Sequence, residues 1–425
     1  MWVIKKIEKD IVMKKLKLLF LFLPLLTLGQ TIELKGIIDT SNFGTDVWEY
    51  IDEATGNVYA IVGGDGIAMI DVTDPTAPFE TDHLPTVPGF DVKIWSHYAY
   101  CATGGGGTGR VVDLSDPTNI VSVGSFPSPH NIYIDERGYM YNSSPGVRIY
   151  DLNPDPTNPQ FLIQVGSQGH DVTVRGNIMI DAHGGSGTNL YDVTDPASPL
   201  LLSTITDPTI SYHHQGDISE DGNYLYICDE LGSHPQADIS VWDISTITAP
   251  FRVSDVADPN ATPHNMYVIG DYAYASYYSA GFKVFDISDP SELVIADVYD
   301  THSSNSEGFN GAFGVYPSRE TANIYINDRT NGIFIFGFSE LLSNGDISEN
   351  SFEYAVYPNP TTGVLTINTS SEINDIALFD VQGRQLLKLS NQSILGEYTM
   401  DLTAYTSGIY FIAVNNKQTK KIVLK

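Results

Sequence analysis

The phrase GIAMIDVTDP at residues 66–75 decides the fold, because variants of it return along the chain. Most variants place a Gly, alternating apolar residues, an Asp and a Ser/Thr-containing turn in one order. The shared Asp stands at Asp71, Asp113, Asp151, Asp192, Asp243 and Asp286. A seventh copy, NGIFIFGFS at 331–339, keeps the apolar residues but lacks this Asp. Self-similarity at a period of about 40–50 residues indicates a repeat architecture.

Each copy follows two alternating segments joined at Gly, Asp or Asn, which is typical of a β-hairpin. The first six copies are followed by a further apolar stretch, such as LVIADVYD at 293–300. Radial units of four strands predict an all-β protein with a seven-bladed β-propeller at 31–340. Six or eight blades would follow from one miscounted hairpin, and an open solenoid would need polar caps.

The seventh unit lacks its own fourth strand, because a polar linker at 341–351 follows it. The segment IELKGIIDT at 32–40 has no hairpin of its own and resembles LVIADVYDT at 293–301. We therefore expect the N-terminal strand to close the last blade. Such closure removes the open sheet edges through which β-proteins aggregate.

Residues 1–30 predict a secretory signal peptide. Six Lys precede or flank the apolar run LLFLFLPLLTL at 18–28, which is followed by Gly-Gln. This run is shorter than the about 20 residues that a membrane-spanning helix needs, so none is expected in the mature chain. A retained N-terminal anchor is the alternative. Met13 opens MKKLKLLF and is a second candidate for the true start.

The rest of the chain consists of two parts that differ in net charge. Residues 31–351 carry 44 acidic and 10 basic side chains, whereas 352–425 carry six of each. The net charge of −30 excludes a nucleic-acid binder that works by neutralising phosphates. The tail alternates apolar and polar residues between Gly, Pro and Asn turns, which predicts a small antiparallel β-sandwich at 352–425.

The tail also resembles a known family. AVYPNP at 355–360, FDVQGR at 379–384, DLTAYTSGIYFIAV at 401–414 and KKIVLK at 420–425 follow the order of the type A C-terminal sorting domain. That domain belongs to proteins exported by the type IX secretion system of the Bacteroidetes. The resemblance implies that 352–425 contacts the secretion machinery and that the chain is secreted or displayed at the outer-membrane surface. An ordinary C-terminal sandwich with a binding role is the alternative.

The repeats resemble the LVIVD-repeat proteins, and in particular the choice-of-anchor B family. The likeness rests on the DVTDP and DISDP phrases, on the PHN and GHD sequences, and on HHQGDISEDGNYL at 213–225. The resemblance implies a surface-exposed or secreted propeller. It implies no reaction, because the family has no firmly assigned activity.

Candidate site residues lie where the first strands of the blades begin, since these strands line the central channel of a propeller. Four successive first strands open with His, and the second strands end on the same face with acidic residues, His and Arg. The candidate ligand-binding residues are Asp91, His130, Asn131, Asp171, His183, Asp229, Glu230, Asn265 and Arg329, and the candidate metal ligands are His170, His214 and His264. The alternative is that each His only braces its blade through backbone hydrogen bonds.

These features favour a secreted or cell-surface binding module whose polar channel mouth binds a divalent cation or another polar ligand, such as a surface glycan or a protein. No catalytic residue can be named. One alternative is a metal-dependent hydrolase or lyase that uses the channel histidines. The other is an adhesive or scaffolding protein without a small-molecule site, because a propeller fold alone does not decide function.

Overall fold

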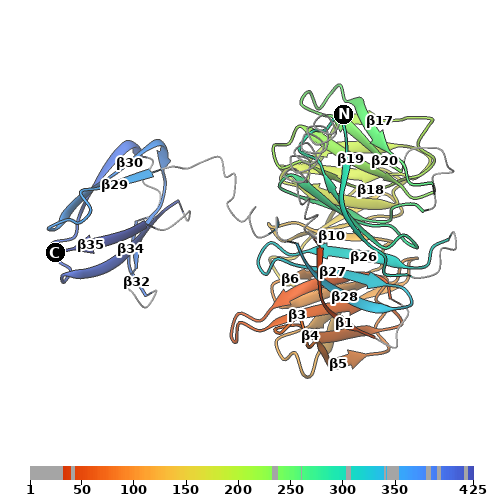
Figure 1. The fold of residues 1–425 in the computed structure, drawn as a ribbon, viewed down its shortest axis with the longest axis horizontal. Coiled ribbons are helices and arrows are strands. Elements are labelled where there is room, and N and C mark those ends of the chain that lie inside the picture. The colour runs from red at the N-terminus through yellow and green to blue at the C-terminus, as the bar shows by residue number, and fades with distance from the viewer. Residues whose placement is uncertain are drawn as a thin grey trace, which may run out of the picture. The chain divides into compact units, whose positions relative to one another are not determined.

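A computed structural model describes residues 32–39, 44–231, 238–259, 261–302, 308–338, 341, 354–379, 384–389, 394–415 and 420–425. The predicted signal peptide and nearly all of the predicted linker lie outside these residues. All elements in Figure 1 that have assigned bounds are β-strands, β1 to β35, so the all-β prediction is confirmed. In the described part of the chain, no helix is both apolar and long enough to cross a membrane. Contacts divide the chain into two compact units, Met1–Gly345 and Asp346–Lys425.

In the larger unit, the described residues form seven four-stranded antiparallel sheets. In six of them, consecutive strands are neighbours. The strands, sheet by sheet, are β2 (Val47–Ile51), β3 (Val58–Gly63), β4 (Ile67–Asp71) and β5 (Phe79–Leu84); β6 (Asp91–Trp95), β7 (Tyr98–Ala102), β8 (Thr108–Asp113) and β9 (Val121–Pro127); β10 (Ile132–Ile134), β11 (Tyr139–Asn142), β12 (Val147–Asp151) and β13 (Gln160–Val165); β14 (Asp171–Arg175), β15 (Ile178–Ala182), β16 (Thr188–Asp192) and β17 (Leu200–Ile205); β18 (His213–Ile218), β19 (Tyr224–Asp229), β20 (Ile239–Asp243) and β21 (Phe251–Val256); β22 (Met266–Ile269), β23 (Tyr272–Ser276), β24 (Phe282–Asp286) and β25 (Val294–Tyr299); β26 (Ala312–Pro317), β27 (Asn323–Asp328), β28 (Gly332–Phe338) and β1 (Ile32–Ile38).

The seventh sheet is completed from the other end of the sequence. Strand β1 pairs antiparallel with β28, from Ile32 opposite Phe338 to Ile38 opposite Ile333, and Figure 1 shows the red β1 beside the blue-green β28. This is the pairing that the likeness between 32–40 and 293–301 predicts. If only strands that are consecutive in the sequence paired, β28 would be left with an unpaired edge.

The first strands of the seven sheets contact one another in chain order, β2, β6, β10, β14, β18, β22 and β26, and β26 also contacts β2. We call these seven the inner strands. Hydrophobic clusters fill the space between neighbouring sheets. In one of them, Tyr325, Ile333 and Ile335 of the last sheet pack with Val47 and Ala60 of the first. Burial of each large apolar side chain contributes about 1.5–3 kcal/mol, so the contact between the last and first sheets is part of the core.

The repeated Asp of the motif has a local structural role. Asp71 ends β4, and its Oδ1 accepts the backbone N–H of Thr73 at 2.9 Å. The equivalent carboxylates of the next five sheets make the same bond at 2.8–2.9 Å. An Asp that binds the N–H two residues later forms an Asx turn, which stops the strand and starts the turn to the next one. The Asp that reveals the repeat in the sequence is therefore the residue that forms this turn.

A second buried carboxylate, Asp238, lies just before β20 and is fully shielded from solvent. It accepts the backbone N–H of Asp258. Burial raises the pKa of Asp238 to about 7, although that hydrogen bond and Lys283 act in the opposite direction.

Replacing Asp238 by Asn is expected to remove one component of the pH dependence of stability. Because the folded-state pKa lies above the unfolded value, the folded state binds more protons than the unfolded state between about pH 4 and 7. The wild type should therefore lose stability as the pH rises through this window, on the order of 1 kcal/mol per pH unit from this group. Urea unfolding of both proteins at pH 4.5, 6 and 7.5 checks this, and parallel pH profiles would contradict it.

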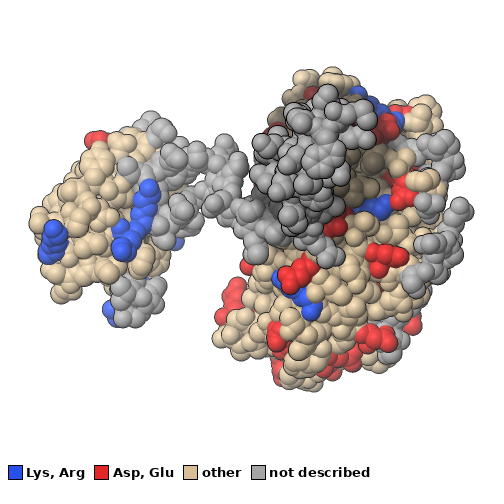
Figure 2. Space-filling view, viewed as in Figure 1, with Lys and Arg blue, Asp and Glu red and all other residues tan. Residues whose placement is uncertain are grey.

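In the smaller unit, the described residues form two antiparallel sheets. Buried side chains of both sheets, including Leu365, Ile367, Ile376, Leu378 and Ile412, share one hydrophobic core, so the sheets pack as a sandwich. On the face shown in Figure 2, acidic side chains are spread over the larger unit and Lys and Arg side chains stand out on the smaller one. The strands are β29 (Tyr354–Tyr357), β30 (Val364–Ile373) and β33 (Ile394–Asp401) in one sheet, and β32 (Gln385–Leu389), β31 (Ile376–Phe379), β34 (Gly408–Val414) and β35 (Lys420–Leu424) in the other.

Candidate functional site

A pocket lies where the inner strands begin. Its lining residues stand one or two positions before an inner strand or at its first or second residue, so the repeat brings equivalent positions of different sheets together. The lining residues are Asp46, Phe90, Asp91, His130, Asn131, Asp171, His214, His264, Asn265 and Phe313.

Six aromatic side chains form a closed circle at this pocket, one from each of six successive sheets. We call it the aromatic ring. Neighbouring centroids are 3.7–5.7 Å apart, including the last step from Phe313 back to Phe90, which is 5.7 Å. Tilted and edge-on contacts at such distances are favourable for aromatic groups. The members, in order, are Phe90, His130, His170, His214, His264 and Phe313.

Backbone carbonyls hold three of these histidines. The Nδ1–H of His130 donates to Gly104 O at 2.6 Å, that of His214 to His264 O at 2.9 Å, and that of His264 to Phe313 O at 3.1 Å. A carbonyl oxygen can only accept, so Nδ1 carries the proton and the neutral ring keeps its lone pair on Nε2. Each bond reaches a neighbouring sheet, so the histidines brace adjacent sheets rather than only their own.

Burial keeps the imidazoles of His170, His214 and His264 neutral. It lowers the pKa of His170 to about 3, with a smaller effect from His214, and it lowers the pKa of His214 to about 3, with a smaller effect from His130. The pKa of His264 is lowered well below its usual value by burial and by His214. A neutral imidazole is the form that binds a metal ion or accepts a hydrogen bond.

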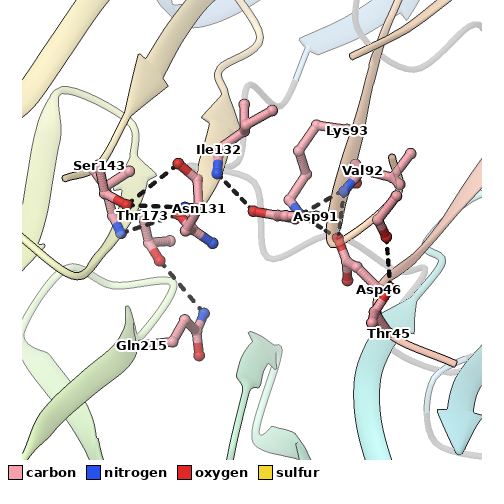
Figure 3. Close-up of polar contacts among 12 residues, drawn as sticks. Thr45, Asp46, Asp91, Val92, Lys93, Asn131, Ile132, Ser143, Thr173 and Gln215 are labelled. Atoms are coloured by element: carbon pink, nitrogen blue, oxygen red, sulfur yellow. Dashed lines mark hydrogen bonds and ion pairs between the residues drawn. The ribbon is translucent and has the colours of Figure 1, made fainter. Parts of the chain in front are cut away.

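Polar side chains at the pocket link four pairs of neighbouring sheets. A carboxylate or amide oxygen at the start of one inner strand accepts a backbone N–H from the following inner strand, as Figure 3 shows for Asp91 and Ile132. Two equivalent oxygens, Asp171 Oδ1 and Asn265 Oδ1, are buried without a hydrogen-bond partner in the described part of the chain. The links are Asp46 to Val92, Asp91 to Ile132, Asn131 to Val172 and Gln215 to Met266, at 2.6–3.2 Å.

A buried lysine compensates two of these carboxylates. Lys93, at 2% exposure, donates from Nζ to Asp46 Oδ2 at 2.6 Å and to Asp91 Oδ1 (Figure 3). Burial raises the pKa of Asp46 to about 8, because it outweighs the attraction of Lys93. Burial also opposes ionisation of Asp91, but there Lys93 prevails and the pKa of Asp91 is lowered. The Lys93 ammonium also lies 4.9 Å from the ring centroid of Trp48.

Glu230, just after β19, lies beside two histidines of the aromatic ring. One ligand atom from each of His170, His214 and Glu230 falls within 4.8 Å of the others. The His214 Nε2 and Glu230 Oε2 atoms are 3.5 Å apart. The hydroxyl of Tyr278 donates to Glu230 Oε1 at 2.5 Å and thereby orients the carboxylate.

The structure brings most of the sequence-predicted site residues together. The pocket includes Asp91, His130, Asn131, Asp171, His214, His264 and Asn265, and His170 joins it through the aromatic ring. Arg329 lies at its edge, with its guanidinium 4.7 Å from the Phe313 ring centroid.

Two predicted residues are not brought into the pocket. The His183 Nε2 lies 2.7 Å from Asp181 Oδ2, so this ring pairs with its own strand. The carboxylate of Asp229 accepts the backbone N–H groups of Ser211 and Tyr212 at 2.6 and 2.8 Å. Adjacent residues on an extended chain point to opposite sides, which explains why Glu230 reaches the histidines and Asp229 does not.

Phe313, Lys93 and Tyr278 are the site residues that the sequence analysis missed. Phe313-Gly314 stands in the same register as His264-Asn265, so alignment of the seventh repeat on this pair would have found Phe313. Lys93 is two residues after Asp91, on the same side of its strand. Tyr278 follows β23 as Glu230 follows β19.

Comparison with known proteins finds two family models that match parts of this chain. A model of the secretion system C-terminal sorting domain matches residues 355–425, and a model of the LVIVD repeat matches residues 90–127 and 264–301. The resemblances to LVIVD-repeat proteins and to the type IX C-terminal sorting domain are thereby confirmed for the matched residues. The sorting domain indicates export by type IX secretion to the extracellular or outer-membrane surface, and it implies contact with the secretion machinery.

No curated protein matches the sequence. Among solved structures, the chain is similar to the computationally designed Ika8 protein, with 10% identity, a TM-score of 0.47 and coverage of 93% of this chain and 100% of the other. It is also similar to the structure of U3-55K, with 9% identity, a TM-score of 0.52 and coverage of 72% and 98%. The second likeness concerns the fold alone.

Proposed function

We propose that the seven sheets are the blades of a closed seven-bladed β-propeller, completed by β1 and followed by a β-sandwich sorting domain. The circular order of contacts among the inner strands supports this, as does the hydrophobic cluster shared by the last and first sheets. We assign 1–30 to a signal peptide, 31–340 to the propeller, 341–351 to a linker and 352–425 to the sorting domain. The LVIVD-repeat matches favour a member of the choice-of-anchor B group.

The exported propeller is, in this proposal, a binding module whose pocket receives a small polar ligand. The observation that carries it is the pair of unpartnered buried acceptors, Asp171 Oδ1 and Asn265 Oδ1, in side chains that line the pocket. A buried polar atom without a partner costs about 1–3 kcal/mol. A ligand that donates hydrogen bonds recovers this free energy, so we expect glycan hydroxyls or a cation rather than an anion.

The chemistry of the pocket supports binding more than covalent catalysis. No Ser, Thr or Cys is among the described residues that line it, and the ammonium of the neighbouring Lys93 is held by two carboxylates. The aromatic ring offers flat apolar surfaces beside neutral imidazole acceptors. Such a mixture of apolar walls and a few converging polar atoms is typical of ligand pockets.

The test is calorimetric titration of the secreted chain with a panel of soluble glycans and, separately, of divalent cations. We expect at least one member to bind, and Asn265→Ala to weaken binding of a hydrogen-bonding ligand about tenfold, which is the loss of one hydrogen bond. Asn189→Ala is the matched control, because Asn189 bonds Thr204 outside the pocket. The proposal would be refuted if no member of either panel binds, or if the two variants weaken binding equally.

A further inference from the structure

His170, His214 and Glu230 come from two neighbouring sheets and meet at the side of the pocket. His170 directly precedes β14, His214 is the second residue of β18, and Glu230 follows β19 of the same sheet. Their ligand atoms lie within 4.8 Å of one another. The group thus spans the contact between two sheets, close to the backbone bridge between Gly184 and His213.

Two of these groups face each other as acceptors. His214 uses Nδ1–H for the carbonyl of His264, so its Nε2 lone pair is directed elsewhere, and the Oε2 atom of Glu230 lies 3.5 Å from it. A lone pair and a carboxylate oxygen repel at this distance unless a proton or a metal ion lies between them. The His170 Nδ1 atom is also buried and has no hydrogen-bond partner among the described residues.

The surroundings hold the ligands in place. The hydroxyl of Tyr278 donates to Glu230 Oε1 and leaves Oε2 directed toward His214. The carbonyl of His264 fixes the His214 tautomer. Partners that orient metal ligands in this way are a regular feature of metal sites.

We propose that His170, His214 and Glu230 bind one divalent first-row transition metal ion. Two imidazoles and one carboxylate are a ligand set that suits Zn²⁺, with a further coordination position open toward the pocket. Tetrahedral bonds of 2.0–2.1 Å place ligand atoms about 3.3–3.5 Å apart, so these side chains must close by about 1 Å around the ion. The proposal deepens the proposed function, because it names the cation and the part of the pocket that takes it.

The experiment measures zinc directly. The full secreted chain is stripped with a chelator, titrated with Zn²⁺ by calorimetry, and analysed for metal content after gel filtration. We expect one equivalent of zinc per chain in the wild type. Glu230→Gln and His170→Gln should each weaken binding by at least tenfold, and Tyr278→Phe, which removes only the orienting hydroxyl, by about tenfold.

His183→Gln is the matched control, because His183 also pairs with a carboxylate, Asp181, but outside the pocket. It should leave zinc binding unchanged. Near-ultraviolet circular dichroism of each variant establishes that the fold persists. A wild type without stoichiometric zinc, or zinc binding that Glu230→Gln and His170→Gln do not weaken, overturns the metal site. Either result would leave the glycan titration standing, because glycan binding is measured separately from the binding of divalent cations.

Discussion

A chain that lacks residues 32–38 is expected to lose cooperative unfolding and to aggregate. This deletion removes β1 and all six of its residue pairs with β28, and it uncovers the edge of the last sheet. It also removes Ile32, which is 2% exposed and whose backbone N–H donates to Asp297 of the neighbouring sheet at 2.8 Å. At about 1 kcal/mol per backbone hydrogen bond and about 1.5–3 kcal/mol for the buried Ile, the loss is about 5 kcal/mol or more. That approaches the whole stability of a typical domain.

Thermal melting and size-exclusion chromatography of the truncated chain measure this effect. A synthetic peptide covering 31–40, added in trans, should restore a cooperative transition because it can pair with β28. A scrambled peptide of the same composition should not. A truncated chain that stays monomeric and melts like the wild type would show that β1 is dispensable and would remove the main physical argument for closure by the N-terminal strand.

Lys93→Met is expected to destabilise the larger unit by about 3–5 kcal/mol near neutral pH, which is the usual effect of removing one partner of a buried charge cluster. The substitution keeps the length of the side chain but leaves Asp46 and Asp91, at 3% and 4% exposure, without a cation. The defect should shrink as the pH falls toward 4, since protonated carboxyls need no compensating charge. Urea unfolding at pH 4.5 and 7.5 measures both effects.

Two further variants make this result specific. The triple variant Asp46→Asn, Asp91→Asn, Lys93→Met should recover most of the lost stability, because no buried charge remains uncompensated. Lys35→Met is the matched control: the Lys35 ammonium donates to the neutral Asn323 side chain at 2.8 Å and is only partly buried, so its loss should cost about 1 kcal/mol or less. A Lys93→Met protein as stable as the Lys35→Met protein would show that the buried cluster is not essential.

The position of the site could be predicted from the sequence, and its internal geometry could not. His130, His170 and His264 open first strands, so any radial arrangement of the repeat brings them to one mouth. Neither the repeat nor its composition distinguishes Glu230 from Asp229, or His170 from His183. The difference depends on the side of the strand to which each side chain points and on the groups that it contacts there.

The order of repeats and domains along the chain depends on local interactions and contiguous motifs. It could therefore be obtained from the sequence alone. The Asx turns at Asp71 and its equivalents involve residues two apart, and the sorting motifs at 355–425 are contiguous. Contacts between sheets decided the rest: which histidines keep a free lone pair, which carboxylates share Lys93, and which acceptors stay without a partner. Most of those outcomes depend on the distances between groups of different sheets, such as Lys93 and Asp46 or His214 and His264, and no local pattern encodes such distances.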